Sequence, residues 1–515
     1  MAKIETKIGK DVIESLTLGM YEDARFIYRE YIQNSADQID EAVRSNLIDS
    51  HRDGRIEIQI NHETESISIY DNATGIKANK VQPILKNIAK STKDRTKNKG
   101  FRGIGRLGGL GYCDKLIFET SYKGEASRSY LIWDAKKLKN IINNRTQKED
   151  AASVIDDVTE YRKDKQKADA HYFKVTLEGV SNIDLLDKEK IYEYLSMVAP
   201  VSYNKGFIFK NKIYEKAKEL DCHIDEYPIF VNKNQIYKPY TTSIYEGGKT
   251  DKKKIDEIHD IETFELRTSK NALLAWGWIG ISSFTKVMPV VNTARCIRLR
   301  KGNIQIGLED AMTKLFKEER GTKYFFGEIH VMNVDLIPNA RRDYFLENQE
   351  LKGFETMCKA KFEELHKLYY FSSKVRNEKK KIDDFVSFTK EYNEKSTNGG
   401  FSDDKEKKAY QEKLETKKEK AEKAEKELEK AKEKVTKSPK AQKKVFDKVV
   451  GKKQEEVDKV VIVEDGGKTK YITDDITKLS KKDRKLVSRI FGVIDNVLPK
   501  ELSNILKEKI KEELQ

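Results

Sequence analysis

The sequence predicts an α+β fold at the N-terminus, a second α/β domain after it, and a helical C-terminal region. Three observations lead to this prediction. Helical and strand patterns are mixed over residues 1–180, a second set of both patterns follows over residues 181–373, and Lys and Glu dominate residues 374–460. A chain of 515 residues is also too long for one compact core, so several domains are expected.

The first domain, residues 1–180, opens with a pattern typical of two consecutive helices over residues 10–44. Alternating apolar and polar residues then predict half-buried strands at 56–60 and 66–71. Later strands are predicted at KLIFETSY, RSYLIWD and YFKVTLEGV, with a polar loop over residues 140–170. Helices with an antiparallel-leaning sheet favour a sandwich in which the helices cover one face.

The second domain, residues 181–373, has apolar segments of its own. Strands are predicted at 272–283, 295–307 and 324–334, and helices at 308–319 and 354–370. This set is large enough for a separate α/β core.

Residues 374–460 are rich in both charges, with 27 Lys and Arg against 20 Asp and Glu. A narrow apolar stripe repeats every seven residues, and it consists of Leu414, Ala421, Ala424, Leu428, Ala431 and Val435. The repeat favours a two-stranded or hairpin coiled coil, and a solvated single helix is the alternative.

The last segment, residues 461–515, carries a wider apolar face after Ser480, a predicted N-cap. The residues of this face are Leu486, Val487, Ile490, Phe491, Ile494, Val497 and Leu498. We expect it to join two subunits into a homodimer. The alternative is that it folds back on residues 440–475 and leaves a monomer that pairs with a second chain only when a ligand is bound.

Composition excludes several classes of protein. The four cysteines lie far apart without ligand spacing, which argues against a zinc site and a disulfide framework. Neither an apolar signal segment nor a stretch long enough to span a bilayer is present, so we expect a soluble, cytoplasmic protein without membrane partners. The formal charge of +14 leaves non-specific attraction to nucleic acid open.

The helix containing REYIQNSADQID presents Glu30, Asn34 and Asp37 on one face, because they are spaced i, i+4 and i+7. An amide oxygen can bind Mg²⁺, and a carboxylate can take a proton from an attacking water. By itself the pattern is also that of a solvated helix face.

Asp71 ends a predicted strand and precedes a turn that contains Gly75. A carboxylate at a strand end can accept a hydrogen bond from an exocyclic amine such as that of adenine, and a glycine lets a flat base approach the backbone. An ordinary Asp-Asn turn is the alternative.

A basic segment leads into a glycine-rich loop between Gly100 and Gly111. Backbone N–H groups of such a loop can face phosphate. The loop lacks the GK[ST] of a P-loop, and no strand directly precedes it as a dinucleotide-binding fold requires.

These three motifs, in this order, resemble the GHKL (Bergerat-fold) ATPase superfamily of gyrase, the ninety-kilodalton heat-shock chaperones, histidine kinases and MutL. The resemblance covers about residues 15–180. It implies ATP as ligand, Mg²⁺ as cofactor and ATP hydrolysis as activity, with Glu30 as general base and Asn34 as Mg²⁺ ligand. It also implies that the following residues contact the nucleotide: Asp37, Asp71, Gly75, Ile76, Lys90, Gly100, Gly103, Ile104 and Gly105. Of these, Asp71 would bind adenine and the loop glycines would form a lid over the phosphates.

Two positions depart from the family pattern. Ala73 stands where the family has the first glycine of D-x-G-x-G. Phe173 stands where the chaperones often carry a threonine that helps to hold a water beside adenine, which puts that detail in doubt.

Within the superfamily, the chaperone branch is most similar. IAKSTK and GFRGIG resemble its lid entry and phosphate loop, and DLIPNARRDYF resembles the middle-domain loop that sends an arginine to the γ-phosphate, here Arg342. The second domain, with RLRKGNIQIG, is similar to an S5-type transducer domain. We therefore expect an ATP-driven clamp on a protein client or complex.

The main alternative is a MORC-like, ATP-gated clamp on nucleic acid, which also joins an ATPase, a transducer domain and a coiled coil. A role in bacterial anti-phage defence is a further alternative. The sequence argues against a sensor histidine kinase, because no His precedes Glu30 to act as phospho-acceptor.

Overall fold

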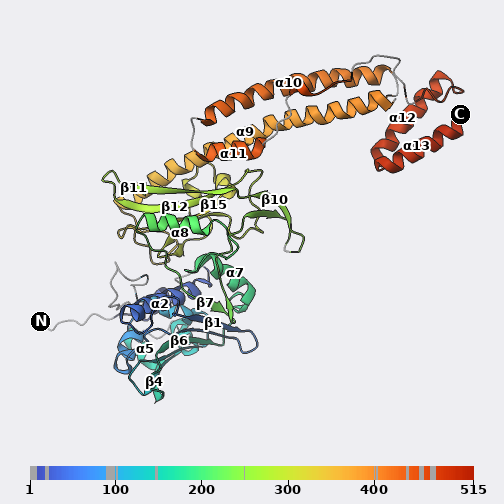
Figure 1. Cartoon of the computed structure of the whole chain (residues 1–515). Coiled ribbons are helices and arrows are strands. Elements are labelled where there is room, and N and C mark those ends of the chain that lie inside the picture. The colour runs from blue at the N-terminus through green and yellow to red at the C-terminus, as the bar shows by residue number, and fades with distance from the viewer. Residues whose placement is uncertain are drawn as a thin grey trace. The chain divides into compact units, whose positions relative to one another are not determined.

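The computed structural model describes residues 8–17, 23–88, 99, 103–144, 149–248, 250–398, 401, 404–436, 440–451, 457–463, 471 and 473–515. The chain divides into two compact units (Figure 1). The first unit comprises Met1–Ser282 with Lys286–His366, and the second comprises Ser283–Thr285 with Lys367–Gln515. The domain limits expected from the sequence, at 180, 373 and 460, stay predictions.

The first unit contains an eight-stranded sheet in the order β5-β4-β3-β6-β2-β1-β7-β8. Its strands are β1 Ile56–Asn61, β2 Ser66–Asp71, β3 Lys115–Ser121, β4 Ser127–Asp134, β5 Thr159–Lys165, β6 Tyr172–Glu178, β7 Ile229–Val231 and β8 Asn234–Gln235. β1 and β7 run parallel, and the other neighbours are antiparallel. The alternation in β1 and β2 turns their isoleucines into the core, as predicted.

Helices cover this sheet, and α2 lies along one face (Figure 1). The helices are α1 Asp11–Thr17, α2 Phe26–Arg44, α3 Val81–Leu85, α4 Ala135–Asn143, α5 Ala151–Asp157, α6 Ile183–Leu186 and α7 Lys188–Val198, with 3-10 turns η1 Ala78–Lys80 and η2 Gly105–Gly111. A further helix, α8 Lys210–Glu219, packs in a separate cluster, with Ile213 and Ala217 beside Trp276 and Trp278. The predicted loop over residues 140–170 is wrong, because α5 and the edge strand β5 lie there. The residues of β5 are mostly polar and exposed, and the apolar alternation by which a strand is predicted is therefore missing.

A second sheet has the order β11-β12-β15-β13-β14, with β13 and β15 parallel, and β9 pairs with β10 beside it. The strands are β9 Ser243–Glu246, β10 Lys253–Glu257, β11 Asp260–Arg267, β12 Leu273–Ile281, β13 Cys296–Lys301, β14 Ile304–Ile306 and β15 Phe326–Val331. The three predicted strand regions are confirmed. The structure is therefore mixed α/β, and the S5-type assignment of this domain stays a prediction.

The helix predicted at 308–319 is wrong. The segment forms turns with two 3-10 pieces, η3 Thr313–Leu315 and η4 Glu319–Tyr324. Its apolar residues imitate a helical spacing, but they are buried individually. Phe316, for example, stacks on Phe362 with ring centroids 4.1 Å apart, so tertiary contacts rather than helix periodicity hold the segment.

A buried group of charges lies within the second sheet around Glu328 of β15. Its carboxylate is fully buried and accepts hydrogen bonds from Arg300, from Lys238 at 2.9 Å and from Tyr240 at 3.1 Å. Burial alone would raise the pKa of Glu328, but Arg300 and Lys238 hold it well below its ordinary value. The Lys238 amine also donates to Asn303 Oδ1 at 2.7 Å. The carboxylate thus compensates two buried cations.

The second unit is helical. Its elements are the C-terminal part of α9 Gln349–Asn398, with α10 Asp404–Thr436, α11 Lys440–Val450, η5 Val457–Lys459, α12 Lys481–Val497 and α13 Lys500–Leu514. α9 and α10 run side by side (Figure 1). The seven-residue stripe of α10 is buried in one cluster with apolar residues of α9, among them Ile382, Phe385 and Phe388. α10 is therefore not a solvated single helix, and its stripe packs within its own chain.

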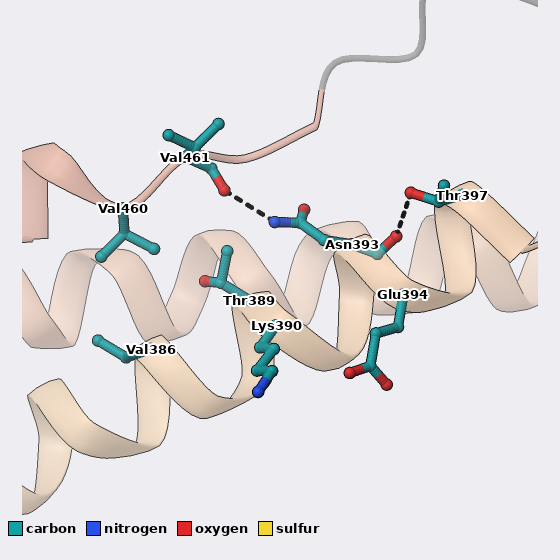
Figure 2. Close-up of a pocket in the computed structure, with 8 residues that line it drawn as sticks. All are labelled: Val386, Thr389, Lys390, Asn393, Glu394, Thr397, Val460 and Val461. Atoms are coloured by element: carbon teal, nitrogen blue, oxygen red, sulfur yellow. Dashed lines mark hydrogen bonds between the residues drawn. The ribbon is translucent and has the colours of Figure 1, made fainter.

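A pocket of about 430 Å³ lies between α9 and residues 460–461 (Figure 2). Asn393 of α9 closes one side, because its Nδ2 donates to the carbonyl of Val461 at 2.8 Å and its Oδ1 accepts from the N–H of Val463 at 3.0 Å. The amide therefore fixes this segment to the helix. None of the predicted nucleotide-site residues lines the pocket.

The C-terminal apolar face divides into two parts. Ser480 caps α12, as predicted, by accepting from the N–H of Asp483. Val487, Phe491 and Ile494 pack with Ile476, Leu479, Ile510 and Leu514. α13, in the same segment, therefore covers this part of the face, which leaves fewer residues to join two subunits. An exposed set remains, and it consists of Leu486, Ile490, Val493 and Val497 on α12 with Leu502, Ile505 and Leu506 on α13.

The four cysteines are all described and all free. Among the described residues, no group of His, Cys, Asp and Glu has the arrangement of a metal site. No helix in the described part of the chain is long and apolar enough to cross a membrane.

Candidate functional site

Glu30 lies on the second turn of α2, with its side chain turned into the protein and only 8% of the residue exposed. Its Oε1 accepts no hydrogen bond from any described residue. The guanidinium of Arg342 approaches this oxygen, with Nε at 3.8 Å. An acceptor buried without a hydrogen bond costs free energy and therefore indicates a functional position.

Gly105 lies directly against the same carboxylate. A Cβ atom at this position would come within 2.2 Å of Glu30 Oε2, so a side chain here would displace the carboxylate. The first glycine of η2 thus lets the loop lie against α2 while Glu30 keeps its position. The loop and the predicted general base therefore form one site.

Arg342 comes from the loop after β15, and its own backbone adopts a φ of 55°. This left-handed conformation costs free energy for a residue with a Cβ, and such residues gather at functional sites. The loop is closed by a hydrogen bond from the N–H of Asn339 to the carbonyl of Tyr344, at 2.9 Å. Arg342 is buried while its neighbour Arg341 is exposed.

Arg29, next to Glu30, supports this loop from α2. Its Nη2 donates to the carbonyl of Arg341 at 2.9 Å, and its guanidinium lies over the ring of Phe26. The same nitrogen lies 3.9 Å from Glu30 Oε1. Two guanidinium groups therefore approach one carboxylate oxygen.

Asp71 ends β2 and is buried. Its Oδ2 accepts from the hydroxyl of Ser35 at 2.7 Å, and its Oδ1 accepts from the N–H of Ala73 at 3.2 Å. Ser35 belongs to α2, one residue after Asn34, so the helix fixes the orientation of the carboxylate. Ala73, the departure from the family pattern, is fully buried and supplies this N–H.

Gly75 has a φ of 63°, and a Cβ there would come within 1.9 Å of the carbonyl oxygen of Ser121. The sheet itself therefore requires this glycine. The next N–H, of Ile76, donates to Thr120 Oγ1 at 2.9 Å, and Thr120 in turn donates to the carbonyl of Tyr172. A threonine hydroxyl thus does stand beside this turn, on β3 rather than at position 173.

Asp37 is buried two turns after Glu30, and its Oδ1 accepts from the backbone N–H of Lys99 at 2.7 Å. Asn34, between them on α2, is half-buried. Glu30 and Asp37 of this helix therefore both meet the glycine-rich segment, at Gly105 and at Lys99.

Of the other predicted nucleotide contacts, the structure describes some and not others. Gly103 has a φ of 70°, and Ile104 is buried against Phe26. Lys90 and Gly100 lie outside the described residues.

The residues present fit a nucleotide with Mg²⁺. Carboxylate and amide oxygens on α2 are ligands that Mg²⁺ prefers. A buried carboxylate oxygen without a hydrogen bond can accept a proton from water. An arginine beside it can offset negative charge on a phosphoryl group. Asp71, oriented by Ser35, can accept from an exocyclic amine.

Four residues of this site were not found from the sequence, namely Arg29, Ser35, Thr120 and Lys99. Ser35 and Arg29 could have been suspected, because each adjoins a motif residue on α2. Lys99 likewise adjoins Gly100 of the glycine-rich loop. Thr120 carried no such signal, since it meets the site only through tertiary contacts.

Comparison with known proteins bears on residues 26–166, which match a family model described as Histidine kinase-, DNA gyrase B-, and HSP90-like ATPase. The match runs from the start of α2 to just past β5 and includes Glu30, Asn34, Asp71 and Gly105. No curated protein matches the chain. The match does not distinguish the heat-shock-chaperone branch from MORC-like proteins. It supports a GHKL-type ATPase domain as the N-terminal part of this chain.

Proposed function

We propose that this protein binds ATP with Mg²⁺ and hydrolyses it, as a conformational clamp of the GHKL type. The observation that carries the proposal is Glu30, whose buried Oε1 lacks a hydrogen bond from any described residue while Arg342 lies 3.8 Å away. A structural ion pair would be expected to be closer and hydrogen-bonded. The longer separation between Glu30 and Arg342 is expected if both side chains act on a bound third group rather than on each other.

In this proposal Glu30 takes a proton from the attacking water, and Asn34 supplies an oxygen ligand for Mg²⁺, which would neutralise phosphate charge when bound. Asp71 accepts a hydrogen bond from the adenine amine, with Ser35 and Ala73 holding its two oxygens. Arg342 stabilises the charge that develops on the transferred phosphoryl group. The glycine-rich segment, including Gly100, Gly103 and Gly105 with Lys90 before it, faces the phosphates.

The test separates binding from turnover with two variants of Glu30. Glu30→Gln keeps the shape of the side chain and removes the base, and Glu30→Ala removes both. We expect ATP affinity by calorimetry to stay within a fewfold, and the hydrolysis rate to fall by about 10²–10⁴. Lys86→Gln serves as control, because Lys86 is a charged residue of the same domain that ion-pairs with Asp156. Hydrolysis within about tenfold of the wild type in both Glu30 variants would contradict the assignment.

We further propose that the clamp acts on a protein client or complex. The support is the balance of charges in the helical region, where Lys and Glu alternate instead of forming a one-sign basic arm. A clamp on nucleic acid, as in MORC-like proteins, is the alternative. DNA affinity measured against salt distinguishes the two, because a DNA clamp that contacts several phosphates loses affinity steeply. A weak DNA affinity that changes little with salt concentration favours the protein client.

A homodimer joined by the C-terminal helices completes the proposal. The support is the exposed apolar set on α12 and α13, which includes Leu486, Ile490 and Val493. Exposed apolar surface of this kind is an aggregation liability unless a partner covers it. A second copy of the same hairpin suits the set because the face is apolar and can pair with itself.

A further inference from the structure

Lys99 makes more contacts to the proposed site than its position in a glycine-rich segment would suggest. Its side chain is almost buried, with 11% exposed. The amine lies 2.6 Å from Asp40 Oδ2 on α2 and 3.2 Å from Asp225 Oδ2, and it donates to the hydroxyl of Tyr227 at 2.9 Å. Its carbon chain passes over Gly302, at the turn between β13 and β14. One side chain therefore joins α2 to two segments of the second predicted domain.

The electrostatic surroundings keep this amine charged. Burial alone would lower the pKa of Lys99, but Asp225 and Asp40 outweigh it and raise the pKa above its ordinary value. The same lysine lowers the pKa of Asp40 against the effect of burial. Tyr227 also donates its hydroxyl to Asp40. The Lys99 amine, held between the carboxylates of Asp40 and Asp225, therefore stays charged through the neutral range.

The backbone of Lys99 connects this anchor to two residues of the proposed site. Its N–H donates to Asp37 Oδ1 at 2.7 Å, and its carbonyl oxygen accepts from Arg342 Nη2. Arg342 thus has a fixed acceptor on one side and Glu30 Oε1 on the other. The position of the Lys99 carbonyl oxygen therefore depends on the anchoring of the Lys99 side chain.

The anchor is itself rigid on the side of the second sheet. Asn303 Nδ2 donates to the carbonyl of Asp225 at 2.6 Å, and Asn303 Oδ1 accepts from Lys238. Lys238 belongs to the buried charges around Glu328. Asp225 is therefore held in place by residues of the second domain. Its ion pair with Lys99 holds the lysine side chain in place in turn.

We propose that Lys99 is a positioning residue for ATP hydrolysis: its ammonium, bound between Asp40 and Asp225, fixes the carbonyl that holds Arg342 beside Glu30. The proposal rests on the proposed function and names a residue that acts through Arg342. It implies that hydrolysis depends on the second predicted domain through Asp225 as well as through Arg342.

The kinetic test combines Lys99→Met, which keeps the carbon chain and removes the charge, with Arg342→Ala. We expect Lys99→Met to lower kcat at least about tenfold with KM within about threefold, because the loss is one of positioning. The double variant should lose no more than Arg342→Ala alone, since both changes remove the same interaction. Losses that add would show that Lys99 acts independently of Arg342 and would overturn the proposal.

A second measurement needs no nucleotide. Hydrogen exchange of residues 335–345 in the nucleotide-free protein should become faster in Lys99→Met, because Arg342 loses its fixed acceptor. The matched control is Lys361→Met. Lys361 is 12% exposed and ion-pairs with Glu262 at 2.7 Å, so it is an equally buried, paired lysine of the same unit. It should change neither kcat nor exchange in this loop.

Asp225→Asn tests the same anchor from the other side and serves if Lys99→Met does not fold. It should reproduce both effects, and Lys99→Arg should restore part of kcat. Unchanged exchange of residues 335–345 in a folded variant overturns the proposal, as does an unchanged kcat. If the wild type neither binds nor hydrolyses ATP, the proposed function fails, while the exchange measurement still decides whether Lys99 holds Arg342.

Discussion

Nε of Arg342 lies 3.8 Å from Oε1 of Glu30, although the two residues belong to different predicted domains. The contact brings an arginine of the second domain to the carboxylate proposed as general base. We expect Arg342→Ala to lower the hydrolysis rate on the order of 10²–10³-fold, the range seen when one stabilising donor of a transition state is removed. ATP affinity by calorimetry should change far less.

Arg341→Ala is the matched control for this prediction. Arg341 is the adjacent arginine, but its side chain is exposed, and its backbone carbonyl accepts from Arg29. Its hydrolysis rate should stay within a fewfold of the wild type. An equal effect of the two substitutions, or an equal loss of binding and turnover in Arg342→Ala, would contradict the role of Arg342.

Asp71→Asn should weaken nucleotide binding and leave the protein folded. The carboxylate is an acceptor fixed by Ser35 and by the N–H of Ala73, and an amide in its place offers a donor towards one of these partners or towards the adenine amine. We expect ATP affinity to fall roughly 10- to 100-fold, as for loss of a hydrogen bond to a charged group. Calorimetry measures the affinity, and circular dichroism checks the fold.

Ser35→Ala tests the hydrogen bond that orients the carboxylate of Asp71. This variant keeps the charge of Asp71 and removes only the hydroxyl at 2.7 Å. Affinity should fall less than in Asp71→Asn. Unchanged affinity in Asp71→Asn would remove this residue from the site.

Glu328→Gln should destabilise the second domain by about 3–5 kcal/mol, because Arg300 and Lys238 stay buried without a full counter-charge. Arg300 and Lys238 keep the pKa of Glu328 below its ordinary 4.5. The stability that Glu328 contributes is therefore fully present above pH 4.5, and it is lost as the pH falls through the lowered pKa of the folded protein. Urea unfolding of both proteins at several pH values measures this. The difference between them should shrink below pH 4.5, and a constant difference would argue against the ion pairs.

The C-terminal helices should join two chains. A charge placed in the exposed set, as in Ile490→Glu or Val493→Glu, should convert the dimer to a monomer without unfolding α12, because neither residue belongs to the packed cluster around Phe491. Light scattering without nucleotide measures the mass, and a chain ending at Leu479 should also be monomeric. A monomeric full-length protein, or a truncated chain that stays dimeric, would rule the model out.

Strands β1 and β2 could be predicted because one face of each is buried, and alternation then follows from the geometry of the sheet. Two segments that were predicted wrongly lack such alternation. β5 is an edge strand with mostly exposed residues, and the segment around Phe316 is held by individual contacts such as the stack on Phe362. Neither the exposed edge nor the packed turn leaves a periodic signal.

The sequence by itself determined the order of the motifs, the residues of α2 that share a face, and the mixed α/β character of the chain, because these depend on local spacing and on apolar periodicity. Only the tertiary structure decided which residues meet. Lys99, Asp225, Arg342 and Glu30 come from four separate segments, and nothing in their local sequence links them. Their proximity arises from sheet pairing and from packing between long-range partners, which single-sequence patterns do not encode.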